Sequence, residues 1–199
     1  MIMFSWHASV EGVEATFAQP LQTADLSFLG GRLPPEVHVD LEECLRASLQ
    51  AAENKLRPGQ GSTMLTPAGI SMNTAGSLSV LSDYEVDFAY DDEAVDKALN
   101  NMFGEIIAEA ADLRCMALNY YVRMKDPTEG GGPQDVSMRR STDWQDRTPA
   151  PPGSVEAVTV DLEHRAGVAF AIFMPYAWQR STLIVGDLIA APTRRQVWS

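Results

Sequence analysis

Two stretches of the chain carry apolar residues at the three- and four-residue intervals of an amphipathic helix. The first runs from about Leu41 to Leu56, with Asp40 as its predicted N-cap and Pro58-Gly59 after its end. The second runs from Val95 to Met124. Unbroken, the second helix would be about 50 Å long, whereas a compact domain of this size is roughly 40–45 Å across. We therefore expect it to bend near Gly104 or to project toward a partner.

Alternation of apolar and polar residues predicts strands in the remainder of the chain. Near the start, the pattern predicts a hairpin over residues 2–17. Pro67 restricts the strand around it to a sheet edge, and Pro175 is expected to end another strand. After the first helix the pattern predicts strands at residues 64–72, 77–82, 83–90, 158–162, 168–174 and 183–190.

This order of elements predicts an α+β fold, in which an antiparallel β-sheet has two main helices, one of them long, packed on one face. The 199 residues suit a single domain, with a long Pro/Gly-rich loop at about residues 126–153. Over about residues 40–175 the element order resembles that of the type III secretion chaperones. That resemblance implies dimerisation and the binding of a protein partner, and it rests on no motif residue.

Composition narrows the possible partners and the compartment. The net charge of −12 disfavours binding to nucleic acid, whose phosphates would be repelled. No apolar run approaches the roughly 20 residues that span a bilayer, so we expect no membrane insertion. Cys44 and Cys115 are the only cysteines and lie on apolar faces, which favours buried, reduced thiols over a disulfide. We therefore expect a cytoplasmic protein.

An acidic cluster is the first candidate for chemistry, since the common catalytic and phosphate-binding motifs are missing. The cluster extends over residues 83–92 and comprises Asp83, Glu85, Asp87, Asp91 and Asp92. Its first three members alternate along one predicted strand and could hold a divalent metal ion for hydrolysis, with Glu163 or His164 as a further ligand or base. The alternative is that the three acids form the solvated face of a half-buried strand. Likewise, Glu163 and His164 could form an exposed polar turn.

The long loop supplies the candidate for recognition. It carries Arg139, Arg140, Trp144 and Arg147, and arginine and tryptophan contribute most of the binding energy at many interfaces. Trp144 could equally fold back onto its own domain. The sequence thus favours a non-catalytic binding or assembly protein that acts as a homodimer, with a protein partner as a further option and no cofactor. A metal-assisted hydrolase and a small-molecule carrier with an apolar cavity stay open as alternatives.

Overall fold

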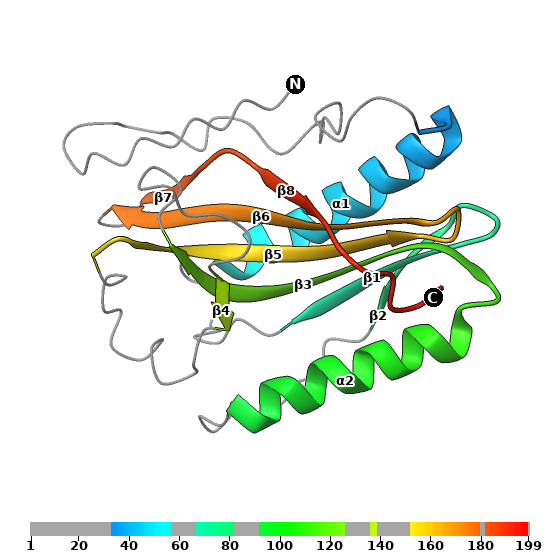
Figure 1. The fold of residues 1–199 in the computed structure, drawn as a ribbon, viewed down its shortest axis with the longest axis horizontal. Helices are drawn as coiled ribbons and strands as arrows, with labels where there is room; N and C mark the ends of the chain where they lie inside the picture. Colours follow the sequence, from blue (N-terminus) through cyan, green and yellow to red (C-terminus); the bar gives the residue numbers. More distant parts are fainter. Residues whose placement is uncertain are drawn as a thin grey trace.

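The structure of the chain is a computed structural model that describes residues 33–56, 67–81, 92–125, 136–138, 152–179 and 182–198. Helices and strands follow one another along these ranges as Figure 1 shows. The elements are α1 (Pro35–Leu56), β1 (Ala68–Asn73), β2 (Leu78–Leu81), α2 (Asp92–Glu109), β3 (Leu113–Lys125), β4 (Val136–Met138), β5 (Ser154–His164), β6 (Val168–Gln179), β7 (Thr182–Val185) and β8 (Ile189–Pro192).

The eight strands form one antiparallel sheet in the order β2-β1-β3-β5-β6-β7. Strand β4 adds to β3, and β8 adds to β6. The long strands β3, β5 and β6 form the centre, where Cys115 faces His164 and Glu156 faces Tyr176 across the ladders. The predicted α+β fold, with an antiparallel sheet and two helices, is confirmed.

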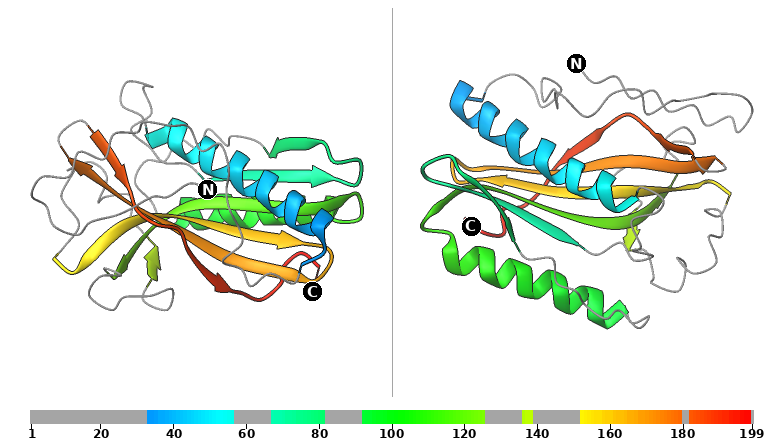
Figure 2. Two further views of the ribbon diagram at one scale, coloured as in Figure 1. Left: turned by 90° about the horizontal axis from the view of Figure 1, so that it is seen from above. Right: turned by 180° about the vertical axis from the view of Figure 1, so that it is seen from behind.

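Helix α1 crosses one face of the sheet (Figure 2). It begins at Pro35 rather than near residue 41, because proline fits the first turn of a helix, where its missing N–H has no helical partner. The amide of His38 donates to the carbonyl of Pro34 at 3.0 Å. Asp40 is therefore not the N-cap but lies within α1, only 5% exposed. The predicted apolar stripe is buried throughout, at Leu41, Cys44, Leu45, Leu49, Ala52 and Leu56.

The predicted long second helix is wrong in its C-terminal half. Helix α2 ends at Glu109, and after a short turn the chain enters β3. An 18-residue helix is about 27 Å long, which fits within the domain. Residues 113–124 have apolar side chains at helical spacing, but most residues between them are apolar as well. Such a run suits a strand buried on both faces, and β3 is buried along most of its length.

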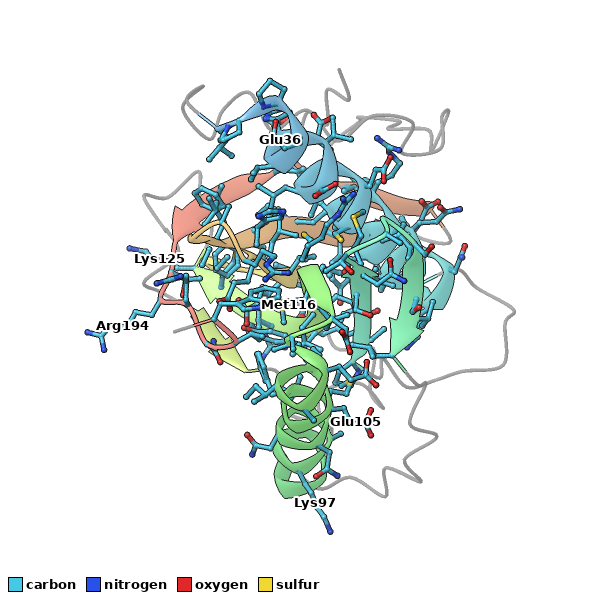
Figure 3. The ribbon with its side chains drawn as sticks, turned by 90° about the vertical axis from the view of Figure 1, so that its right-hand side faces the viewer. Glu36, Lys97, Glu105, Met116, Lys125 and Arg194 are labelled. Carbon is cyan, nitrogen blue, oxygen red and sulfur yellow. The ribbon has the colours of Figure 1, made fainter. Side chains whose placement is uncertain are left out.

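The two helices contact opposite faces of the sheet, and not one face as the element order suggested. Figure 3 views the sheet with α1 above it and α2 below it, and Lys97 points from α2 away from the sheet. The alternation of β3 side chains explains this arrangement. Its α1 face carries Cys115, Ala117 and Tyr121, while its other face carries Met116 and Leu118, which cluster with Met102 and Ile106 of α2.

Two prolines occupy positions that differ from the prediction. Pro67 lies just before β1, and β1 pairs with β2 on one side and β3 on the other, so it is not an edge strand. Strand β6 continues through Pro175 to Gln179. Its outer edge pairs with β8 before Pro175 and with β7 after it. The Pro175 carbonyl accepts the amide of Gly186 at 2.8 Å, so the missing N–H also faces this outer side.

Other predicted elements have mixed outcomes. Strands near residues 68–72, 78–81, 158–162 and 168–174 are confirmed. The predicted strand at 183–190 is divided into β7 and β8, and the predicted loop at 126–153 contains β4. The predicted hairpin over residues 2–17 and the predicted strand at 83–90 lie outside the described residues.

Candidate functional site

Asp40 joins helix α1 to one end of the sheet. Its Oδ1 accepts a hydrogen bond from Nη2 of Arg114 at 2.7 Å, and its Oδ2 lies 3.2 Å from Nε2 of His164. The side chains of Asp40 and His164 are buried, whereas that of Arg114 is one-third exposed. Because a buried carboxylate needs a compensating charge and hydrogen bonds, these contacts fix the beginning of α1 against β3 and β5.

Both ring nitrogens of His164 are engaged. The amide of Ala166 donates to Nδ1 at 3.1 Å, so this nitrogen carries no proton. In the neutral ring the proton is then on Nε2, which donates it to Asp40. A general base needs a free nitrogen that faces a substrate. In this arrangement His164 therefore closes the β5–β6 turn, and the predicted exposed polar turn is wrong for this residue.

Glu163, on the opposite face of β5, binds the end of the chain. Its Oε2 accepts the backbone N–H groups of Gln196 at 2.9 Å and Val197 at 3.1 Å, and its Oε1 accepts that of Trp198 at 3.0 Å. The indole N–H of Trp198 donates to the carbonyl of Ala110 at 3.1 Å, just after α2. Glu163 is only 4% exposed, so here too an exposed turn is wrong. These bonds attach the C-terminal segment to the sheet and to the end of α2.

Asp161 lies beside Glu163, and its Oδ2 accepts a hydrogen bond from the hydroxyl group of Tyr120 at 3.1 Å. Burial raises the pKa of Asp161 from 3.8 to about 6, the Tyr120 hydrogen bond opposes this rise, and the charge of Glu163 adds to it. Burial and Asp161 together raise the pKa of Tyr120. The folded state therefore binds the Asp161 proton more tightly than the unfolded state does. The stability that this proton contributes is complete below about pH 3.8 and is lost as the pH rises through about 6.

A small hollow beside Asp161 is also lined by Phe103, Met116, Glu163 and Arg194. Its volume of about 10 Å³ accommodates about one water molecule. Small-molecule sites usually have volumes of about 300–1,000 Å³. This hollow therefore does not provide the apolar cavity that a small-molecule carrier needs.

The two cysteines lie in the core between α1 and β3. Cys44 and Cys115 are free thiols and fully buried, as the sequence predicts. Cys115 lies on strand β3, however, and not on a helix. Burial raises the pKa of the Cys115 thiol, and the neighbouring Cys44 thiol raises it further. A thiol that is buried and protonated is a poor nucleophile.

Strand β2 forms one edge of the described sheet and is exposed along most of its length. Leu78 is 43% exposed and Val80 is 64% exposed. The register places Leu78 beside Met72 and Val80 beside Ile70, two β1 residues that are buried beneath α1. The apolar surface under α1 thus continues onto an edge of the described sheet.

The candidate residues from the sequence are only partly described. Arg139, Arg140, Trp144 and Arg147 lie outside the described residues, as do Asp83, Glu85 and Asp87. The predicted metal ligand His164 is described and is bonded as above. In the described parts of the chain, no three His, Cys, Asp or Glu side chains gather to hold a metal ion.

Comparison of the chain with protein-family models, with curated proteins and with solved structures finds no match. The resemblance in element order to type III secretion chaperones gains no support from these comparisons. Neither of the helices in the described ranges is long and apolar enough to cross a membrane.

Proposed function

We propose that this chain is a non-catalytic assembly protein that forms a homodimer through the open edge of its sheet. The observation that carries this proposal is strand β2, whose Leu78 and Val80 expose apolar side chains beside an edge of the described sheet. An exposed, uncovered sheet edge is a template for pairing with another strand. Proteins that do not use such an edge usually protect it by keeping the strand short or with charges, proline or a bulge, and of these devices β2 has only its length of four residues.

Charge indicates which surface of the chain a second copy approaches with the least repulsion. The chain has a net charge of −12, so two copies repel each other over much of their surface. Residues 58–82, which include all of β1 and β2, contain no charged side chain. Like-charge repulsion between two copies is therefore smallest where this hairpin faces its counterpart. No protective lysine or glutamate interrupts β2.

The engagement of potentially reactive groups supports the non-catalytic part of the proposal. His164 uses both ring nitrogens in internal hydrogen bonds, and Glu163 uses both carboxylate oxygens. Cys115 is fully buried with a raised pKa. His164 and Glu163 hold parts of the fold together, and the hollow that Glu163 lines is too small for a substrate.

The test compares two lysine substitutions by size-exclusion chromatography with light scattering. Val80→Lys places a charge on the β2 edge, whereas Val39→Lys places the same charge on α1, where the native valine is 50% exposed. We expect unmodified protein and Val39→Lys to approach twice the 21.8 kDa chain mass at high concentration. Val80→Lys is expected to stay at the mass of one chain. Equal masses for the two variants would refute the proposal.

The same experiment also tests the alternative function, a metal-assisted hydrolase. A single-chain mass at every concentration, together with a melting temperature that rises with Mg²⁺ or Mn²⁺, would contradict assembly and point to the carboxylates at Asp83, Glu85 and Asp87.

Circular dichroism of Val80→Lys and Val39→Lys checks that folding is unchanged, as expected for substitutions at exposed positions.

A further inference from the structure

We propose that two copies of the chain pair β2 with β2 in antiparallel orientation, with Ser79 on the two-fold axis. This inference rests on the proposed homodimer and specifies its geometry. It follows from three features of the hairpin: the direction of its backbone groups, the register of β1 and β2, and the alternation of its side chains.

Alternate residues of β2 direct their backbone N–H and C=O groups outward from the sheet. The amide of Asn73 donates to the carbonyl of Ser77 at 3.0 Å, so the Ser77 carbonyl faces β1. Along a strand, successive residues direct their N–H and C=O groups to alternate sides. Ser79 therefore also faces β1, opposite Ser71 in the register. The N–H and C=O groups of Leu78 and Val80 point away from the sheet.

Hydrogen bonds of β1 agree with this alternation. The amide of Ala68 donates to the side chain of Asn119 on β3, which is the side away from β2. Five residues later, the amide of Asn73 donates toward β2. Even-numbered β1 residues thus face β3, and odd-numbered residues face β2. Since Met72 faces Leu78 in the ladder, the backbone groups of Leu78 point away from β1, toward the side where the described sheet has no further strand.

The outward-facing groups and the strand's length determine the register between the two copies. Residues opposite one another in an antiparallel pair lie on the same face of the sheet. With Ser79 on the axis, Leu78 faces Val80 of the second copy, and both have outward-facing backbone groups. The two symmetric pairs form four backbone hydrogen bonds. With Val80 on the axis only two bonds form within β2, because Leu78 would then face residue 82 beyond the strand's end.

The side chains fit the Ser79 register. Leu78 and Val80 of the two copies lie on the face that α1 covers, where they extend the cluster that contains Ile70 and Met72. On the other face two serines meet across the axis, and their small size permits close approach. Four-residue strands bury less than the roughly 1,200 Å² of a standard interface, so we expect a weak dimer whose population depends on concentration.

Cysteine cross-linking tests this register. A residue on the axis lies in a pair without mutual backbone bonds, with a Cα–Cα distance of about 4.5 Å, which is within the range for a disulfide. We expect Ser79→Cys to form an intermolecular disulfide in oxidised glutathione. The two introduced thiols lose two electrons and two protons, and oxidised glutathione is reduced to two glutathione thiols. Cys44 and Cys115 are fully buried and should not compete.

Ser77→Cys is the matched control, because Ser77 is exposed in the same hairpin. In the Ser79 register the two copies of residue 77 are about 14 Å apart along the strands, too far for a disulfide. We expect cross-linking of Ser79→Cys to be about tenfold faster or more, by the effective-concentration argument. Equal rates, or no cross-link for Ser79→Cys while light scattering detects a dimer of unmodified protein, would refute the register and leave the proposed function standing. A single-chain mass for unmodified protein would refute both the register and the proposed homodimer. If Ser79→Cys forms a cross-link only to an added extended peptide, the β2 edge binds a different partner and the proposed pairing of two copies is refuted.

Discussion

Replacing Glu163 by alanine tests how the C-terminal segment is held. The substitution removes the acceptor for three consecutive backbone N–H groups, those of Gln196, Val197 and Trp198, at 2.9–3.1 Å. The sequence of the C-terminal segment itself is unchanged in this variant. The bond from the Trp198 indole to the Ala110 carbonyl remains, as do the apolar contacts of Val197 and Trp198. We expect the segment to separate from the sheet more often.

The magnitude follows from the exposure of the groups that lose their partner. A hydrogen bond to a charged group contributes about 1.5–3 kcal/mol to stability when it is buried. Gln196 is exposed, and Val197 and Trp198 are half-buried, so water replaces part of what is lost. The three bonds are therefore not additive, and we expect the free energy of unfolding to fall by about 2–4 kcal/mol. A local opening cost lower by about 2 kcal/mol accelerates amide exchange roughly thirtyfold.

The assay combines urea denaturation with hydrogen exchange resolved to residues 196–198. Glu163→Gln keeps one acceptor oxygen and should give an intermediate loss of stability. Glu109→Ala removes an exposed carboxylate near the same end of α2 and should change stability by less than about 0.5 kcal/mol. The reasoning is refuted if Glu163→Ala matches Glu109→Ala in stability and leaves exchange at residues 196–198 unchanged.

Three further predictions concern buried groups. Asp161→Asn should gain stability relative to unmodified protein, by at most about 3 kcal/mol, between pH 4 and pH 7, because the raised pKa destabilises the charged form; a pH-independent difference in urea denaturation would contradict this. Asp40→Ala should lower the free energy of unfolding by about 2–4 kcal/mol. A double-mutant cycle with His164→Ala should give a coupling energy above about 0.5 kcal/mol, and additive losses would contradict an interaction between Asp40 and His164. Cys44 and Cys115 should resist a thiol-specific reagent in the folded protein and react fully in denaturant; rapid labelling at native pH would show that their burial is wrong.

Local sequence patterns predicted most of the strands and the first helix. The apolar stripe of α1 and the alternation at residues 158–162 indicate these elements, because α1 buries one face and β5 is buried along most of its length. The division between α2 and β3 was not predicted. Leu113, Ala117, Tyr120 and Met124 satisfy helical spacing, while burial on both faces of a central strand removes the polar positions that would distinguish the two.

Long-range contacts explain the remaining differences. Asp40 has the residue type of an N-cap, but its partners Arg114 and His164 are more than 70 residues away in the chain. Glu163 has the position of a turn residue, but the chain end covers it. Exposure of Val80 is likewise a property of the sheet edge. The absence of charge from residues 58–82 was the signal in the sequence that could have marked this hairpin.

The central claim, that the chain assembles with itself, is tested most directly by the light-scattering mass of unmodified protein over a wide range of concentrations. We predict a mass that rises from 21.8 kDa toward twice that value as the concentration increases, with no effect of Mg²⁺ or Mn²⁺. A mass that stays at 21.8 kDa at every concentration would contradict the account.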